Sequence, residues 1–363
     1  MRQYNVDIFD RGLNFLVNDV VSVNRIDDDY ISSKANTIEI KPTSLVKAGD
    51  FIRLQNDSTN FFGVITDAAP GEKLTSITYK SFITIFDESI LFNTKNQGTD
   101  VNVSHPTLEQ TLYNYINAAY ISTSDTYQRL PITVTIASGT QTARWSLGIL
   151  PDTETGQYAI VKLYSDLIVE ALKKYGVGIT VTPSFSAKKI NLVIGKHTEK
   201  FKIDGNLKNV NVATLKYNDK PTGINKLIVY NSNNYGENVT FYVHPDRSWD
   251  VNDQDRISPV FKEVTGTVPD QDYADPAEGF IAAAVDSAYS ILEGQQWDNL
   301  IELEVSPSDA NIQPLEMEIG QTVTLYYKEG TYTSILTGKV IEPEIITLLF
   351  GSERIEYSKR SKW

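Results

Sequence analysis

The chain has 363 residues and a formal net charge of −13, from 46 acidic and 33 basic side chains. It has no cysteine, which excludes disulfides, thiolate metal sites and cysteine nucleophiles. It also has only three histidines. The excess of acidic residues argues against a protein that binds DNA tightly, although it suits a surface along which DNA slides. No run of 18 apolar residues could span a membrane, and Asp7, Asp10 and Asn14 interrupt any signal-peptide core.

The length predicts two to four domains, and residues 1–104 read as the first of them. Alternating strands are expected at 20–26 and 31–40, and the polar run Asp27–Asp29 between them indicates a turn. Further strands are expected at 51–55, 61–67 and 74–86. Short strands with polar turns are typical of a small β-barrel or sandwich.

Residues 105–195 predict an α/β domain. Thr107 and Gln110 have the spacing of a capping box and open a helix. A second helix is expected at about 158–175, with Gly176 as its C-terminal cap. The apolar faces of the two helices are Leu108, Leu112, Tyr115 and Ala119, and then Ile160, Tyr164, Leu167, Ala171 and Tyr175. Strands are expected at 131–137, 178–183 and 189–195.

The rest of the chain predicts a second barrel that is interrupted by an insertion. Strands at 199–203, 210–217 and 225–231 come before the insertion, and strands from 299–305 to about 355 follow it. The insertion contains a strand at 238–244 and a helix that starts at Asp275-Pro276, with an apolar face of Ala282, Val285, Tyr289 and Leu292 and an end at Gly294. The predicted domains are 1–104, 105–195, 196–230 with 300–363, and 231–299.

The predicted fold class is therefore mainly β with α/β parts: two similar small β-barrels, an α/β domain between them, and a domain inserted into the second barrel. An internal repeat supports the two barrels. The stretch GDFIRLQNDSTNFFGVITD at 49–67 resembles GQTVTLYYKEGTYTSILTGKVIE at 320–342. The repeat aligns Gly49 with Gly320, residues 51–54 with 322–325, and Gly63 with Gly338, with loops that differ by four residues. Any two hairpins share alternation and turn glycines, so coincidence stays an alternative.

Several groups of side chains were weighed as chemical sites. Asp27–Asp29 could hold a cation, but a solvated turn is the favoured interpretation. The run Asp250, Asn252, Asp253 and Asp255 lacks the glycine and the glutamate of a calcium loop, which favours an acidic surface loop. His244-Pro245-Asp246 has no nucleophile motif beside it and is interpreted as a turn. No P-loop, GxGxxG or HExxH motif is present.

Tryptophans and the chain end offer weaker signals. Trp145, Trp249, Trp297 and Trp363 could bind sugars or partners, although tryptophan in a mainly β protein more often belongs to a core or an interface. A glycosidase needs only two carboxylates, and no pair stands out among the 46 acids. The basic end SERIEYSKRSKW could contact an acidic partner, and a solvated tail is its default interpretation. No catalytic, cofactor-binding or metal-binding residue is predicted, and no cofactor.

The stretch NKLIVYNSNNYGENVTFYVHPDRSWD, followed by DRISPVFKEV, a helix and NLIELEV, resembles the hub proteins at the tail tip of tailed bacteriophages. These are baseplate hub proteins, including the structural N-terminal part of tail-associated lysins. The matching positions are Tyr230, Asp246, Arg256–Val260, the helix from Pro276, and Ile301–Val305. The element GDFIRL…GVITD resembles the first barrel of that family. The lysins continue into a peptidoglycan-cleaving domain, whereas this sequence stops at Trp363.

The resemblance implies a non-enzymatic virion protein at the distal end of a phage or prophage tail, made in the cytoplasm of the bacterial host. The interrupted apolar run at the N-terminus predicts that the mature protein begins at Met1. It implies a homotrimeric ring that adapts a sixfold tail tube to a threefold tip and passes DNA on infection. The implied partners are a hexameric distal tail protein, the tape measure protein, and tip fibre or receptor-binding proteins. Specific nucleic-acid binding and a membrane span are not expected. The alternative function is a carbohydrate-active enzyme or sugar-binding adhesin at the bacterial surface.

Overall fold

The computed structural model is mainly β, as predicted, and its strands form two curled sheets, two smaller sheets and a two-stranded ribbon. It describes residues 2–57, 59–87, 90–93, 107–139, 142, 159–197, 200–217, 224–231, 234–244, 248–254, 262–268, 276–288, 291–292, 297 and 299–352. Within these ranges, no helix combines the length and apolar character that crossing a membrane requires.

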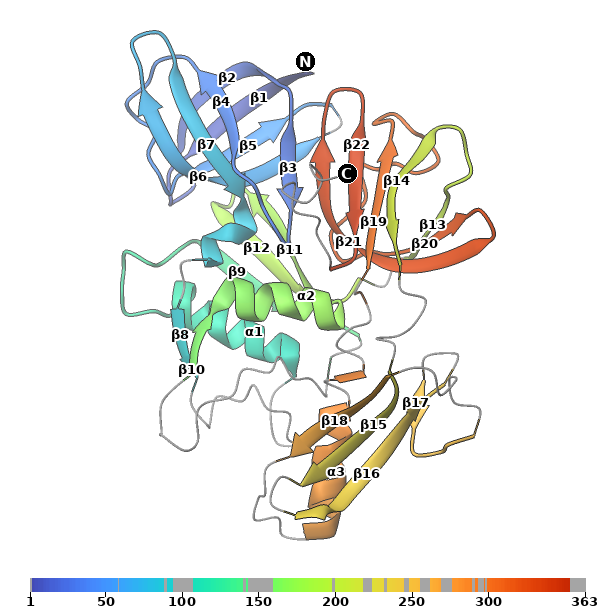
Figure 1. Ribbon diagram of the computed structural model, residues 1–363. Coiled ribbons are helices and arrows are strands. Elements are labelled where there is room, and N and C mark those ends of the chain that lie inside the picture. Colours follow the sequence, from blue (N-terminus) through green and yellow to red (C-terminus); the bar gives the residue numbers. More distant parts are fainter. Residues whose placement is uncertain are drawn as a thin grey trace.

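The first curled sheet, called the N-terminal sheet, has the strand order β2-β1-β5-β6-β7-β4 (Figure 1). Its strands are β1 (Arg2–Phe9), β2 (Phe15–Val23), β4 (Asn36–Ile40), β5 (Phe51–Gln55), β6 (Asn60–Pro70) and β7 (Thr75–Ser81). Alternating residues point into a shared interior, and Val6, Ile8, Ile52 and Ile77 are fully buried there. The predicted strand at 74–86 ends at Ser81, because Phe82–Phe86 forms a 3₁₀ helix that buries three aromatic and apolar side chains.

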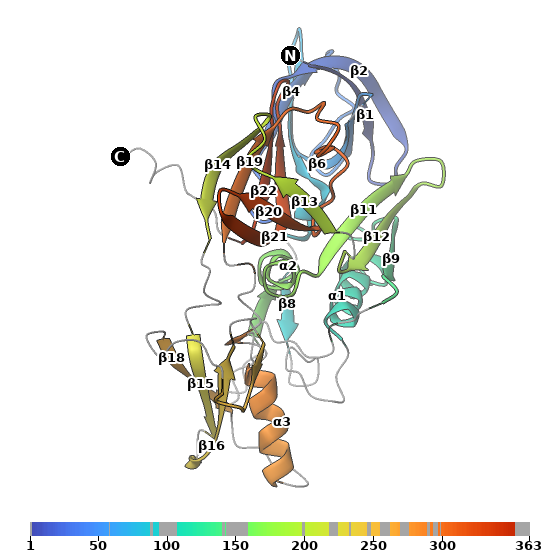
Figure 2. The same cartoon turned by 90° about the vertical axis from the view of Figure 1, so that its right-hand side faces the viewer.

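The second curled sheet, called the C-terminal sheet, has the order β13-β20-β21-β22-β19-β14. Its strands are β13 (Lys200–Asp204), β14 (Val210–Lys216), β19 (Leu300–Val305), β20 (Thr322–Tyr327), β21 (Gly330–Ile341) and β22 (Ile346–Phe350). The two curled sheets lie side by side in Figure 1, and after a quarter turn the C-terminal sheet lies in front of the N-terminal sheet (Figure 2). Their interiors form one continuous apolar cluster that includes Ile26, Ile77 and Leu348.

One short strand, β3 (Ile26–Asp29), lies between the two curled sheets. It belongs by sequence to the first barrel, yet it pairs antiparallel with β21 of the C-terminal sheet. The prediction of a solvated turn at Asp27–Asp29 is therefore wrong. Asp27 and Asp29 are buried, and backbone amides replace the water that a turn would supply: the Asp27 carboxylate accepts from the Lys34 amide and the Asp29 carboxylate from the Ile31 amide.

An α/β layer lies below the curled sheets in Figure 1. The three-stranded sheet β11-β12-β9 is formed by β9 (Ile132–Ile136), β11 (Gly178–Ser184) and β12 (Lys189–Gly195) and is covered by α1 (Leu108–Ile116) and α2 (Val169–Tyr175). The predicted cap of α1 is confirmed, since the Thr107 side chain accepts a hydrogen bond from the Gln110 backbone. Gly176 caps α2 in the left-handed conformation, with φ of 68°.

The predicted helix at 158–175 starts later than expected. Residues Ala159–Lys162 form β10, which pairs with β8 (Ile90–Asn93), and a π-helical turn at Leu163–Ile168 leads into α2. Ile160 therefore lies in a strand instead of on the helix face. A π-helical turn, Asn117–Ile121, also extends α1 and contains Ala119.

A four-stranded sheet with the order β17-β16-β15-β18 lies apart from the rest, at the bottom of Figures 1 and 2. Its elements are β15 (Ile224–Asn231), β16 (Asn234–Val243), β17 (Trp249–Asp250), β18 (Lys262–Val268) and α3 (Pro276–Ala288). Strand β15 pairs with β16 and β18, so residues 224–230 join this sheet instead of the second barrel. Helix α3 packs through Phe280, Ala284 and Ala288. Of the predicted apolar face, Leu292 is buried in the same cluster and Val285 packs against it, while Tyr289 and the Ala282 side chain lie outside the described part of the chain.

Candidate functional site: the repeat and its junction

The loop before β5 and the loop before β20 have the same hydrogen bonds. Gly49 and Gly320 both have left-handed backbones, with φ of 90° and 94°. Their amides donate to the Ile65 and Leu336 carbonyls, each over 2.8 Å. The side chain of the next residue then closes each loop: Asp50 accepts from the Lys47 amide over 2.8 Å, and Gln321 accepts from the Glu318 amide over 2.7 Å. Glycine is required at both positions because a Cβ would strain this backbone.

The strands that follow keep the same register. In the N-terminal sheet Phe51 pairs with Val64 and Ile65 with Tyr79, and in the C-terminal sheet Thr322 pairs with Ile335 and Leu336 with Phe350. Every pair is displaced by 271 positions, which is 320 minus 49. Ladder β4–β7 also matches ladder β19–β22 pair for pair, from Asn36–Tyr79 with Ile301–Phe350 to Ile40–Thr75 with Val305–Ile346.

Both sheets carry a β-bulge at the same position. The register shifts at Thr66 in β6 and at Thr337 in β21. Each threonine hydroxyl donates to the strand opposite, from Thr66 to the Thr78 carbonyl over 3.2 Å and from Thr337 to the Leu349 carbonyl over 3.1 Å. Bulges re-aim a strand and are not produced by alternation alone. Their coincidence makes chance an inadequate explanation of the repeat.

The strand order is also the same, with two differences. The run β1-β5-β6-β7-β4 corresponds to β13-β20-β21-β22-β19. Strand β14 pairs with β19, whereas its counterpart β2 pairs with β1. Strand β13 runs parallel to β20, while β1 runs antiparallel to β5. The two sheets thus share the order of five strands and the register of four of them, β5-β6-β7-β4 with β20-β21-β22-β19, and differ in how the first hairpin closes each sheet.

The sequence alignment was right at one glycine and wrong at the other. Gly49 and Gly320 are equivalent, as are residues 51–54 and 322–325. Gly63, however, pairs with Ile52 and corresponds to Ser334, while Gly338 corresponds to Asp67. Equal numbers of residues therefore separate equivalent pairs in the two hairpins, whereas alignment on the glycines requires a difference of four. Aligning Gly63 with Gly338 misplaced the second half of the repeat, because the backbone approaches different neighbours at these two glycines.

Strand β3 forms a junction that contacts three parts of the molecule. The Asn36 side chain at the start of β4 makes two bonds with the Asp27 backbone, over 2.7 and 3.0 Å. The ladder to β21 and the Tyr30 amide, which donates to the Thr337 carbonyl over 3.0 Å, hold the C-terminal sheet. The Tyr164 hydroxyl of the α/β layer donates to the Tyr30 carbonyl over 2.6 Å. The junction therefore fixes the relative placement of the two repeats.

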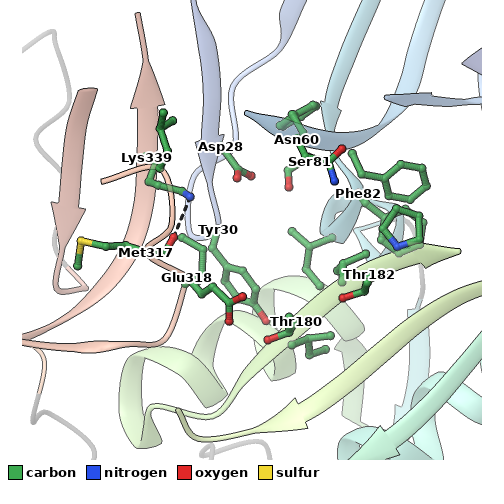
Figure 3. A pocket seen from close by; sticks show the side chains of 18 of the residues that line it. Asp28, Tyr30, Asn60, Ser81, Phe82, Thr180, Thr182, Met317, Glu318 and Lys339 are labelled. Carbon is green, nitrogen blue, oxygen red and sulfur yellow. Dashed lines mark hydrogen bonds between the residues drawn. The ribbon is translucent and has the colours of Figure 1, made fainter. Parts of the chain in front are cut away.

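A cavity of about 430 Å³ lies under β3, where the two curled sheets meet β11 (Figure 3). Asp28 and Lys339 enter it from facing strands, and the Lys339 ammonium donates to the Met317 carbonyl over 2.9 Å. Tyr30, Thr180 and Glu318 also line the cavity. Opposite charges in this shared space attract each other across the junction between the sheets.

Burial dominates the electrostatics of this cavity. Desolvation raises the pKa of Asp28 above its ordinary value of 3.8, and the Lys339 charge and a Ser81 hydrogen bond oppose that rise. Desolvation lowers the pKa of Lys339 below 10.5, opposed by Asp28 and Glu318. The Asp28 carboxylate and the Lys339 ammonium therefore each stabilise the charged form of the other. In the described part of the chain, no group of three or more potential metal-binding side chains is found.

The other sequence candidates do not converge on this junction. His244 lies 3.1 Å from Asp250 at one edge of the four-stranded sheet, and Asp250 also accepts from the Asn252 amide. Trp249 packs against Phe241, and Trp297 is buried in the core of the α/β layer. Asp246, Asp255, the range Arg256–Val260 and Trp145 lie outside the described residues, as do Asp275, Gly294 and the basic chain end.

Sequence reasoning missed the two residues that matter most at the junction. Asp28 was grouped with two neighbours as one polar run, and Lys339 was not singled out. One available signal was that Lys339 is the single charged residue of the strand sequence GTYTSILTGKVI. A charge in such a strand indicates a buried partner.

No protein-family model and no curated protein matches the sequence. The fold is similar to that of phage tail and baseplate proteins. A 43 kDa tail protein of prophage MuSo2 from Shewanella oneidensis has 10% identity and a TM-score of 0.49, covering 95% of this chain and 98% of that one. Prophage tail protein gp18 from Listeria monocytogenes EGD-e has 13% identity and a TM-score of 0.47, covering 98% and 96%. A chain of the phage P2 baseplate has 10% identity and a TM-score of 0.46, covering 97% and 100%.

Proposed function

We propose that the chain is a structural hub of a phage or prophage tail tip, which forms a trimeric ring between a sixfold tail tube and a threefold tip. The observation that carries this proposal is the repeat: two curled sheets with the same loops, register and bulge. The resemblance of the sequence to tail-tip hub proteins points to the same role.

The physical argument is one of symmetry. A closed ring reuses the same patch at each interface, so a hexameric partner presents six equivalent surfaces. Three chains that each carry one kind of sheet could engage only three of the six. Three chains that each carry it twice offer six nearly equivalent surfaces and keep threefold symmetry elsewhere. The junction at β3 sets the spacing of the two copies within a chain.

In this proposal the chain acts by assembly and not by catalysis. Its partners are itself, a hexameric distal tail protein, the tape measure protein, and tip fibre or receptor-binding proteins. Its place is the distal end of the virion tail, and the acidic surface of the ring lets DNA pass without binding it. The four-domain division, with the four-stranded sheet and α3 as the insertion, is part of the proposal.

Mass measurement in solution tests this function. The protein is measured alone over a range of concentrations and after mixing with a hexameric tail-tube protein. We expect a species of three times the chain mass of 40.6 kDa, or a complex of three chains with one hexamer. Neighbours and mass action stabilise rings, so the mixture is the decisive arm. A monomer in both arms that hydrolyses cell-wall polysaccharide would establish the enzymatic alternative.

A further inference from the structure

The two repeats differ along one strand edge. In the C-terminal sheet, the second half of β21 pairs with β22 on one side and with β3 on the other. In the N-terminal sheet, the equivalent residues Asp67–Pro70 of β6 pair with β7 on one side only. Within the ranges that the structure describes, no strand pairs with their other side. The edge that β3 covers in one repeat is thus open in the other.

Exposure follows the same difference. Thr337, Gly338, Val340 and Ile341 are buried in β21. Their equivalents Thr66, Asp67, Ala69 and Pro70 are exposed in β6. Strand register and bulge are the same in both, so the covering strand is what separates a buried edge from an exposed one.

The open edge has hydrogen-bonding groups in the positions that β3 uses elsewhere. Gly71 donates to the Leu74 carbonyl over 3.0 Å, so its amide faces β7. Backbone groups alternate along a strand, which directs the groups of Ala68 away from β7 and towards the open edge. The Thr66 carbonyl is the equivalent of the Thr337 carbonyl that accepts from the Tyr30 amide. One donor and several acceptors are therefore available to an added strand.

We propose that this edge of β6, residues Asp67–Pro70, is covered in the assembled protein by an extended segment of a second copy of the chain. The inference rests on the proposed ring function, which it makes specific. In a ring of alternating N- and C-terminal sheets, each junction within a chain has a counterpart between chains. Within one chain, β3 adds to the edge of β21 and joins the two sheets. We therefore expect a strand of the neighbouring chain to add to the equivalent edge of β6.

The open edge of β6 is limited at both ends, so it can accept one short strand but does not favour open-ended aggregation. The bulge at Thr66 re-aims β6 at one end, and Pro70 has no N–H at the other. The free stretch between them matches the length of β3, whose ladder with β21 has four residue pairs. A longer or flatter edge would recruit strands of any protein.

The test removes the edge donor. Ala68→Pro deletes the N–H that faces the open edge, and Glu72→Pro serves as the control because it places proline at the second position of the nearby turn, where proline is ordinary. Loss of this pairing weakens association by roughly tenfold or more. We therefore expect sedimentation or mass photometry to show a loss of trimer for Ala68→Pro and an unchanged trimer for Glu72→Pro. Equal association of both variants overturns the inference.

A second measurement does not depend on a proline variant. The chain has no cysteine, so Asp67→Cys carries a single thiol on the exposed side of the edge strand. Its maleimide labelling rate is compared in the monomer and in the trimer or trimer–hexamer complex, with Asp125→Cys on an exposed loop as the control. Slower labelling of Asp67→Cys alone on assembly supports the inference. A trimer in which both thiols label at the monomer rate overturns it but leaves the hub function intact, whereas the absence of any assembly contradicts both.

Discussion

The N- and C-terminal sheets have the same register and bulge but differ in what surrounds them. Beyond the bulge, β21 pairs with β3 and its residues Gly338, Val340 and Ile341 are buried, whereas their equivalents Asp67, Ala69 and Pro70 in β6 are exposed. The shared part shows what the repeated backbone requires: a left-handed glycine, a side chain that closes the loop, and a threonine at the bulge. The differing part is the edge at which we propose that a second copy of the chain binds. Equivalent substitutions should therefore have equal effects in the shared part and unequal effects at the edge.

The largest effect is expected in the two interiors. Ile77 and Leu348 occupy equivalent positions, each fully buried. Ile77→Ala and Leu348→Ala should each lower the free energy of unfolding by about 2–5 kcal/mol, because each removes buried methyl groups and leaves a cavity. Urea titration followed by circular dichroism measures both. A large loss for one variant and none for the other would break the equivalence of the interiors.

At the edge, a reciprocal exchange should be unequal. A Cβ at Gly338 would lie 3.0 Å from the Asp29 Cα of β3, so Gly338→Asp should push β3 away at a cost of about 1–3 kcal/mol. The reverse exchange, Asp67→Gly, concerns an exposed strand and should cost below about 1 kcal/mol. Hydrogen–deuterium exchange of residues 26–30 reports the loosening directly. Unchanged protection of β3 in Gly338→Asp would show that the close approach is not needed.

The charged groups that line the cavity should give the junction a pH dependence. Because the pKa of Asp28 is raised in the folded protein, the folded state binds this proton more tightly than the unfolded state does. The free energy of unfolding should therefore fall as pH rises through 3.8 towards the folded value, by at most about 1.4 kcal/mol per pH unit. Asp28→Asn should lack this fall, and Asp67→Asn should keep it. Identical profiles for all three proteins would contradict burial as the cause.

Lys339 should have the complementary effect at alkaline pH. Its lowered pKa means that the unfolded state holds this proton more tightly, so the free energy of unfolding should rise from the folded pKa up to 10.5. Lys339→Met should remove that rise. Urea titrations between pH 8 and 10.5 compare the two proteins, and an equal rise in both would assign the pH dependence to other groups.

The smallest effect is expected in the loops that precede β5 and β20. Asp50→Ala and Gln321→Ala each delete one side-chain acceptor for a backbone amide. Each should cost about 0.5–1.5 kcal/mol, and the two costs should agree within that range. Thermal unfolding measures the stability of both variants, with Asp57→Ala in the turn after β5 as the control. A difference between the two loops that exceeds the range would show that their matching geometry conceals different roles.

Much of the fold was predictable because it depends on local patterns. Alternation placed most strands of both curled sheets, the Thr107 cap placed α1, and Gly176 placed the end of α2. Gly49 and Gly320 revealed the repeat, since few residues adopt a left-handed backbone. These features need only neighbours in sequence to be recognised.

The junction was not predictable from local patterns. Asp27–Asp29 reads as a turn because three carboxylates in a row normally require water. Their actual partners include Asn36 and a strand of the opposite sheet. The bulges at Thr66 and Thr337 likewise leave no mark on alternation. The second glycine of the repeat was misaligned because Gly63 and Gly338 serve different close approaches. The site of the proposed assembly emerges only when the two repeats are superposed.

Electron cryomicroscopy of the assembled protein with a hexameric tail protein tests the central claim most directly. The account predicts a ring of three chains in which six curled sheets alternate, N-terminal then C-terminal, at nearly equal angles around the axis. A ring of six chains, or three chains that contact the hexamer through only one kind of sheet, would contradict it.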